Sequence, residues 1–137
     1  MKPMKILLAD DHAIVRHLIT HSIVELGLPS PHETADGAET LNRIQKAAQE
    51  ERPYDLVFLD WNMDGLDGFE VLTACRANPK LANMAIVMLT AESEQHMVLK
   101  AIKAGATSYI TKPFTAKRIQ QTLIEMGAWK KDHPHDI

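Results

Sequence analysis

The chain has 137 residues, enough for one domain with a sizeable core, and its 45% hydrophobic and 24% charged residues are typical of a globular protein. Its net charge of -3 argues against nucleic acid as the main partner, because phosphate contacts need a surplus of Lys and Arg. No apolar run is long enough for a signal peptide or a membrane span, and the single cysteine excludes an internal disulfide. We therefore expect a cytoplasmic protein that neither crosses a membrane nor binds nucleic acid.

The first part of the chain alternates short apolar runs with segments of helical spacing. Residues 6–9 are apolar on both faces, as in a strand buried inside a sheet, and they end at two aspartates. Residues 13–26 have apolar side chains at helical spacing and are followed by a glycine that favours a helix end. A weaker strand is expected over residues 32–35, and a second helix over residues 38–51.

The rest of the chain repeats this alternation three times. Strands are expected over 56–59, 85–89 and 108–110, and helices over 69–77, 93–104 and 115–126. Continuous apolar strands that alternate with helices imply a parallel sheet covered on both faces. The sequence therefore predicts an α/β domain of five strand–helix pairs over residues 1–127, followed by a short polar tail at 128–137.

Polar residues of a particular kind follow four of the five predicted strands. Asp10 and Asp11 follow the first strand, Asp60 the third, Thr90 the fourth and Lys112 the fifth. Because the carboxyl ends of parallel strands meet at one edge of a sheet, we expect these side chains in one crevice. Three carboxylates repel one another, and Mg²⁺ relieves that repulsion. A lysine and a hydroxyl suit phosphoryl oxygens, and an aspartate can be the nucleophile that forms an acyl phosphate.

Four motifs resemble those of the receiver domain of bacterial response regulators. They are LADDH at 8–12, FLDWNM at 58–63, LTA at 89–91 and ITKPF at 110–114. The resemblance covers about residues 5–127. It implies a flavodoxin-like (βα)5 fold with a parallel sheet in the order 2-1-3-4-5. It also implies a signalling switch, and not an enzyme acting on a separate substrate.

The resemblance also implies how the acidic residues act. Asp60 would accept a phosphoryl group from the phosphohistidine of a sensor histidine kinase or a histidine phosphotransfer protein. Asp11, Asp60 and the backbone carbonyl of Asn62 would bind Mg²⁺, with Asp10 acting largely through water.

Further roles follow from the same resemblance. The groups that would hold phosphoryl oxygens are the Thr90 hydroxyl, the Ala91 amide and the Lys112 ammonium. Asn62 and Glu92 would flank the water that hydrolyses the acyl phosphate, and Thr90 with Tyr109 would form a conformational switch. The Lys112–Pro113 bond is expected to be cis, which a proline context permits.

The predicted output is the binding of a target protein to the face formed by residues 93–104 and 108–126. No chain remains for an output domain, so we expect a stand-alone response regulator. Residues 61–63 resemble the chemotaxis branch, whereas Asp11-His12 followed by Arg16 is common in receivers joined to DNA-binding domains, so the branch stays open. A phosphate-shuttling intermediate of a relay is the alternative.

Two other functions are less favoured. An aspartate-nucleophile phosphatase would need a second aspartate where this chain has Asn62, which cannot transfer a proton. A receiver that works without phosphorylation is also disfavoured, because this chain has every residue that phosphorylation needs: Asp10, Asp11, Asp60, Thr90 and Lys112.

Some residues are expected to have no role in the site. Asp64 replaces a proline that is usual in the family; of two roles, tuning metal affinity or facing solvent, we favour the second. His17 and His21 should lie on a solvated helix face, and Cys75 should fill the core.

Overall fold

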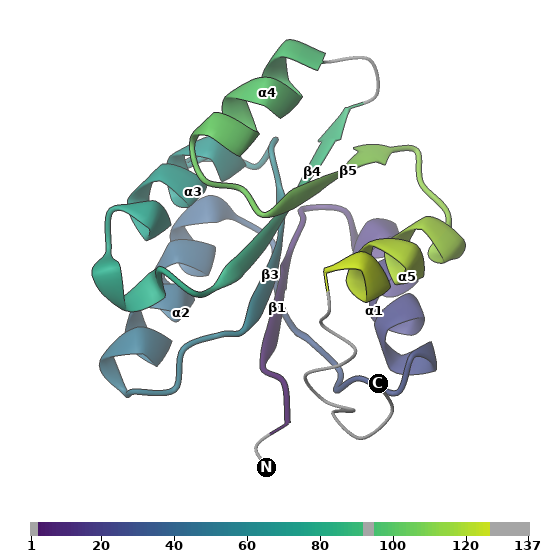
Figure 1. Ribbon diagram of the computed structural model, residues 1–137, viewed down its shortest axis with the longest axis horizontal. Helices are drawn as coiled ribbons and strands as arrows, with labels where there is room; N and C mark the ends of the chain where they lie inside the picture. The colour runs from purple at the N-terminus through teal and green to yellow at the C-terminus, as the bar shows by residue number, and fades with distance from the viewer. Residues whose placement is uncertain (1–2, 92–94, 127–137) are drawn as a thin grey trace.

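The computed structural model describes residues 3–91 and 95–126 and has a central five-stranded parallel sheet between two layers of helices (Figure 1). The strand order is β2-β1-β3-β4-β5, as the sequence predicts. The strands are β1 (Ile6–Ala9), β2 (His32–Thr34), β3 (Leu56–Asp60), β4 (Ala85–Ala91) and β5 (Ser108–Lys112).

The helices divide the core into two clusters, one on each face of the sheet. Helices α1 and α5 cover one face, and α2, α3 and α4 cover the other (Figure 1). Their bounds are α1 (Ala13–Glu25), α2 (Gly37–Gln49), α3 (Gly68–Arg76), α4 (Gln95–Lys103) and α5 (Ala116–Glu125). The strands are buried from both sides, which explains why the central ones are apolar without alternation.

Side-chain caps fix where α2 and α3 begin. Asp36 accepts a hydrogen bond from the Glu39 amide at the start of α2. Asp67 and Glu70 form a reciprocal capping box at the start of α3. These caps bind the first backbone amides of each helix, which have no partner inside the helix. They therefore fix the residue at which the preceding loop ends and the helix begins.

Gly68 allows α3 to begin directly against the end of β3. Its amide donates to the Trp61 carbonyl at 2.8 Å, and a methyl group on its Cα would overlap the Asp60 carbonyl oxygen. The backbone after Asp60 is therefore held closely by the first residue of the next helix.

Strands β3, β4 and β5 extend further toward their carboxyl ends than the apolar runs predict. Asp60 pairs in register with Leu89, Thr90 with Thr111, and Ala91 with Lys112. The polar side chains interrupt the apolar pattern, but their backbones still join the parallel ladder. A further difference is the short 3-10 helix η1 (Pro79–Leu81), capped by Asn78, where the sequence predicts only a break.

Candidate functional site

The carboxyl ends of β1, β3 and β5 bring a lysine between two buried carboxylates. Lys112 Nζ lies 2.9 Å from Asp10 Oδ2 and 3.2 Å from Asp60 Oδ1. Asp10 and Asp60 are 0% and 2% exposed. These residues are far apart in the sequence, and their contact confirms the predicted meeting of strand ends at one crevice.

Asp60 has one engaged and one free carboxylate oxygen. Its Oδ1 accepts from Lys112 and, at 3.4 Å, from the Asn62 amide. Its Oδ2 is buried and has no hydrogen-bond partner within the described part of the chain. Burial and the neighbouring charge of Asp10 raise the pKa of Asp60 to about 6, with Lys112 and the Asn62 amide partly offsetting this rise.

The charge of Lys112 is maintained by its two partners. Burial by itself would lower the pKa of the ammonium, but the hydrogen bonds and attraction of Asp10 and Asp60 outweigh burial and raise that pKa. The lysine is therefore a fixed positive charge beside the carboxylate of Asp60.

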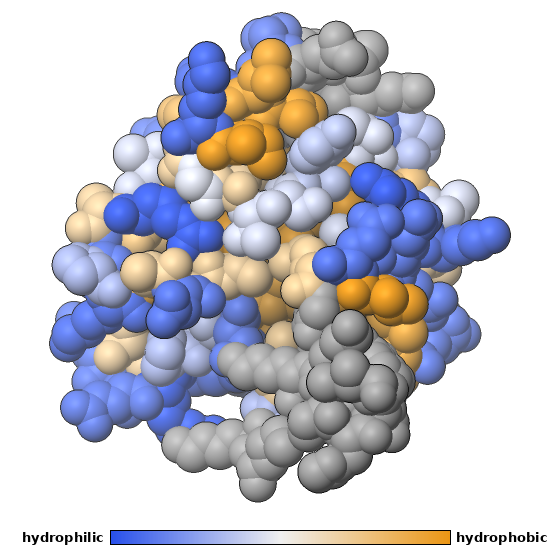
Figure 2. Space-filling model, in the orientation of Figure 1, coloured by the Kyte–Doolittle hydropathy of each residue, from blue (hydrophilic) through white to orange (hydrophobic). Residues whose placement is uncertain are grey.

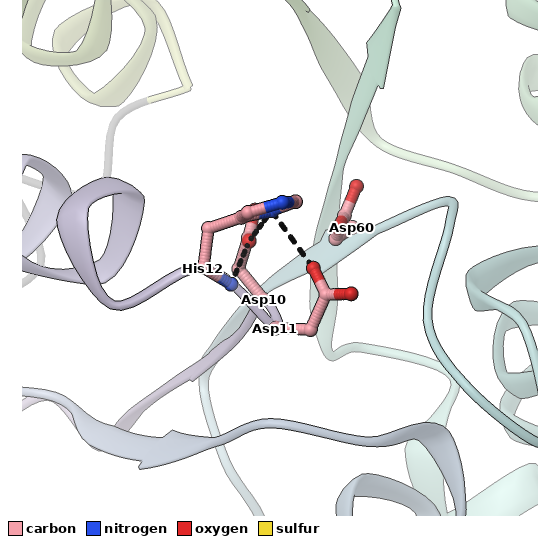
Figure 3. A group of neighbouring side chains, drawn as sticks. All are labelled: Asp10, Asp11, His12 and Asp60. Atoms are coloured by element: carbon pink, nitrogen blue, oxygen red, sulfur yellow. Dashed lines mark hydrogen bonds and ion pairs between the residues drawn. The ribbon is translucent and has the colours of Figure 1, made fainter.

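His12 joins the acidic cluster, a role that the sequence analysis missed. Its Nδ1 lies 2.8 Å from Asp11 Oδ1 and 3.3 Å from Asp10 Oδ1 (Figure 3). One ligand atom from each of Asp10, Asp11, His12 and Asp60 can be chosen so that all lie within 4.8 Å of one another. The only sequence feature that could have suggested this was the position of His12 directly after the acidic doublet.

An open cleft of about 570 Å³ leads to this cluster. Its polar part includes Asp60 and Lys112. Its apolar wall comes from α1 and the β5–α5 loop and contains Val15, Leu18, Pro113 and Phe114. A reacting group could therefore approach Asp60 along a largely apolar surface.

Comparison with known proteins decides the family. The model of the response regulator receiver domain matches residues 6–124. The chain belongs to this family. Receiver domains of this kind are phosphorelay signalling proteins and act as switches.

The relatives of this receiver domain include several chemotaxis proteins. It is 34% identical over 122 residues to chemotaxis protein CheY-3 of Vibrio cholerae serotype O1, covering 89% of this chain and 90% of that protein. It is 32% identical over 120 residues to chemotaxis protein CheY of Pseudomonas aeruginosa, covering 88% and 93%. The structure of chemotaxis response regulator CheY4 of Vibrio cholerae matches with a TM-score of 0.80 and 30% identity, covering 91% of this chain and 99% of that one.

The receiver domain places the predicted switch residues on neighbouring strands. Thr90 is 2% exposed, and its hydroxyl has no hydrogen-bond partner among the residues described. Tyr109 is half-buried, packs against the core cluster under α2, α3 and α4, and pairs in register with Met88 of β4. Glu92 lies outside the described residues. The Lys112–Pro113 bond is cis, as predicted.

The residues expected on the surface or in the core are found there. Asp64 is exposed, and His17 and His21 are exposed on α1, where His21 Nε2 lies 2.9 Å from Glu25 Oε1. Cys75 is buried in the core, and burial raises the pKa of its thiol to about 11. A thiol in this state is a core filler and not a nucleophile.

The carboxylates of the receiver domain fit a divalent metal ion. Asp10, Asp11 and Asp60 form a compact oxygen-rich group, and one Asp60 oxygen is buried without a partner inside the described ranges. A cation would satisfy that oxygen and reduce the repulsion between the carboxylates. Separately, no helix of residues 3–91 and 95–126 has the length and apolar character needed to cross a membrane.

Proposed function

We propose that this receiver domain accepts a phosphoryl group on Asp60 from a phosphohistidine and passes the signal to a target protein. The observation that supports this most directly is the Asp60 carboxylate, which lines the cleft. Its Oδ2 has no partner within the described residues, while its Oδ1 lies 3.2 Å from Lys112 Nζ. A carboxylate oxygen of Asp60 would attack phosphorus, the phosphorus–nitrogen bond of the donor would break, and the histidine would leave as a neutral imidazole after protonation. The proposed donor is a sensor histidine kinase or a histidine phosphotransfer protein.

The transfer needs positioned positive charge more than it needs proton chemistry. Lys112 would hold one phosphoryl oxygen, and the Thr90 hydroxyl with the Ala91 amide would hold another. Asp10, Asp11, Asp60 and the Asn62 carbonyl would bind Mg²⁺. When bound, Mg²⁺ would neutralise negative charge on the carboxylates and the phosphoryl oxygens.

Loss of the phosphoryl group would depend on two residues near the attacking water. Asn62 lies two residues after Asp60 and has an exposed side chain, so it could orient a water at the mouth of the site. Glu92 is assigned the same role only by resemblance to other receivers, because it lies outside the described residues. Orientation of the water is the means by which these residues would change the lifetime of the acyl phosphate.

The proposed switch uses the space beside β4 and β5. The Thr90 hydroxyl is buried and has no partner in the described parts of the chain, so a phosphoryl oxygen would offer it a hydrogen bond that the free state lacks. Movement of Thr90 would let Tyr109 turn inward on the neighbouring strand. A tyrosine suits this role because it has stable half-exposed and buried positions.

The target would bind the face formed by residues 93–104 and 108–126. Two side chains of α4 support this placement, since Leu99 and Ile102 are 62% and 44% exposed, and Figure 2 shows an apolar patch over α4. Apolar patches of this kind mark protein interaction surfaces. In this proposal the receiver spans residues 1–127, acts in the cytoplasm, and has residues 128–137 as a tail.

The proposal is tested by incubating the protein with acetyl phosphate and Mg²⁺ and measuring intact mass. The wild type should gain one phosphoryl group and Asp60→Asn none. Asp64→Asn is the matched control, because it removes an exposed carboxylate from the segment that follows β3. An unchanged gain of mass in Asp60→Asn would show that another residue is the acceptor. A second experiment would phosphorylate the protein with candidate kinases and then measure transfer of the phosphoryl group from Asp60 to a second phosphotransfer protein. Such onward transfer would indicate a relay shuttle, and its absence a switch.

A further inference from the structure

We infer that His12 is an additional ligand of the acidic site, which lets the site bind divalent transition metals such as Co²⁺ and Ni²⁺ through an imidazole nitrogen. This inference rests on the metal site of the proposed function, but it concerns a residue and a class of ion that the proposed function does not include. A hard cation such as Mg²⁺ prefers oxygen ligands, whereas imidazole suits the later first-row metals.

The distances around His12 fit one ion. Two ligands that bind a metal at about 2.1 Å lie roughly 3 to 4 Å apart. His12 Nδ1 lies 2.8 Å from Asp11 Oδ1 and 3.3 Å from Asp10 Oδ1, and the cluster with Asp60 spans no more than 4.8 Å. Small side-chain rotations would therefore bring three carboxylates and one imidazole nitrogen around a single ion.

A second observation points to a ligand at the same place. Asp60 is 2% exposed, and its Oδ2 has no hydrogen-bond partner among residues 3–91 and 95–126. A buried carboxylate oxygen of this kind is costly unless a cation or a donor satisfies it. The unpartnered oxygen thus belongs to Asp60, a member of the group of four residues that includes His12.

The backbone already holds His12 over the acidic pair. His12 precedes α1, and its amide donates to Asp10 Oδ1 at 2.8 Å. Arg16, one turn into α1, donates to the Asp10 carbonyl at 2.7 Å and so helps to hold the same segment. Figure 3 shows the imidazole linked to both Asp10 and Asp11, so metal binding would need little reorganisation of the chain.

The same contacts give His12 opposite effects on the two classes of ion. Its imidazole occupies carboxylate oxygens that Mg²⁺ needs, and it offers Mg²⁺ no favoured bond in return. For Co²⁺ or Ni²⁺ the imidazole instead supplies a bond. Removal of the imidazole should therefore weaken binding of the transition metals without weakening binding of Mg²⁺.

The test measures the affinities of Mg²⁺, Co²⁺ and Ni²⁺ through the fluorescence of Trp61, which follows Asp60 in the sequence. All proteins span residues 1–137 and have Trp129→Phe, so that Trp61 is the one tryptophan in them. They also have His133→Gln and His135→Gln, which remove the imidazoles of the last ten residues. His12→Phe should lower Co²⁺ and Ni²⁺ affinity at least about tenfold, and Mg²⁺ affinity should not fall. His17→Phe is the matched control, because His17 is an exposed residue of α1; it should leave the affinities for Co²⁺, Ni²⁺ and Mg²⁺ unchanged.

Two further readings make the outcome decisive. Co²⁺ gives visible absorption bands that change when nitrogen replaces oxygen, so the bands of the parent protein and of His12→Phe should differ. His12→Gln, which keeps a polar side chain, should lose transition-metal affinity as His12→Phe does. Equal Co²⁺ affinity in parent and variant, or an equal loss for Mg²⁺ and Co²⁺, would overturn the inference and leave the Mg²⁺ site intact. Absence of binding by all three ions in the parent would overturn the proposed metal site itself.

Discussion

Replacement of Asp60 by asparagine is expected to stabilise the folded protein at neutral pH. Asp60 is 2% exposed, and burial together with the charge of Asp10 raises its pKa from 3.8 to about 6. At about 1.4 kcal/mol per pH unit, this rise corresponds to about 3 kcal/mol of lost stability when Asp60 is ionised. Asparagine has nearly the same shape and no charge, so Asp60→Asn should recover up to about 3 kcal/mol.

The effect should depend on pH in a defined direction. Between pH 4 and pH 6 the folded state keeps a proton on Asp60 that the unfolded state releases, so the wild type gains stability as the pH falls through this window. Above about pH 6, the pKa of Asp60 in the folded state, the loss of stability caused by its ionisation is fully present. The difference between Asp60→Asn and wild type should therefore be largest at pH 7.5 and small near pH 4.

Urea denaturation at several pH values, in EDTA to exclude metal ions, measures this difference. Asp64→Asn is the matched control, because Asp64 is exposed and a surface substitution should change stability by no more than about 0.5 kcal/mol. Added Mg²⁺ should stabilise the wild type more than Asp60→Asn and so narrow the gap. If Asp60→Asn were less stable than wild type at pH 7.5, with a difference independent of pH, the electrostatic account of the site would be wrong.

Three further substitutions test other contacts of the site. Lys112→Met should destabilise the protein by about 3–5 kcal/mol at pH 8 and less at pH 5, because it leaves two buried carboxylates without their cation; urea denaturation at both pH values measures this. Gly68→Ala should cost about 1–3 kcal/mol, because its methyl group would overlap the Asp60 carbonyl; a loss of less than 0.5 kcal/mol in thermal unfolding would count against that contact. Phe69→Leu should destabilise the protein by about 0.5–1.5 kcal/mol more than the loss of buried apolar area alone, because the rings of Phe69 and Trp61 stack with their centres 5.3 Å apart. It should also shift the fluorescence emission of Trp61, and an unchanged spectrum would refute the stack.

Much of the fold could be predicted because its strands are buried on both faces. The apolar runs that begin at Ile6, Leu56 and Ala85 have no polar interruption, and helices of regular spacing separate them. The polar residues at the ends of these runs located the crevice, since parallel strands all end at the same edge. Strand β1 ends where its apolar run ends, but β3, β4 and β5 continue one or two residues further, because polar side chains there hide a backbone that still pairs in the sheet.

The parts of the site that the sequence missed depend on packing in three dimensions. His12 enters the acidic cluster through the direction of its ring, which spacing does not specify. The apolar wall of the cleft brings Val15 and Leu18 of α1 against Phe114, which lies about a hundred residues further along the chain. The free oxygen of Asp60 likewise follows from the positions of Lys112 and the Asn62 amide.

The most direct test of the central claim is to locate the phosphoryl group by chemistry. After incubation with acetyl phosphate and Mg²⁺, borohydride reduction converts a phosphorylated aspartate to homoserine, and tandem mass spectrometry of the peptides then identifies the modified position. The account predicts homoserine at position 60 and at none of the other aspartates, and its absence when Mg²⁺ is removed with EDTA. Homoserine at position 10 or 11, or at no position despite a gain of mass, would contradict the assignment of Asp60 as the acceptor.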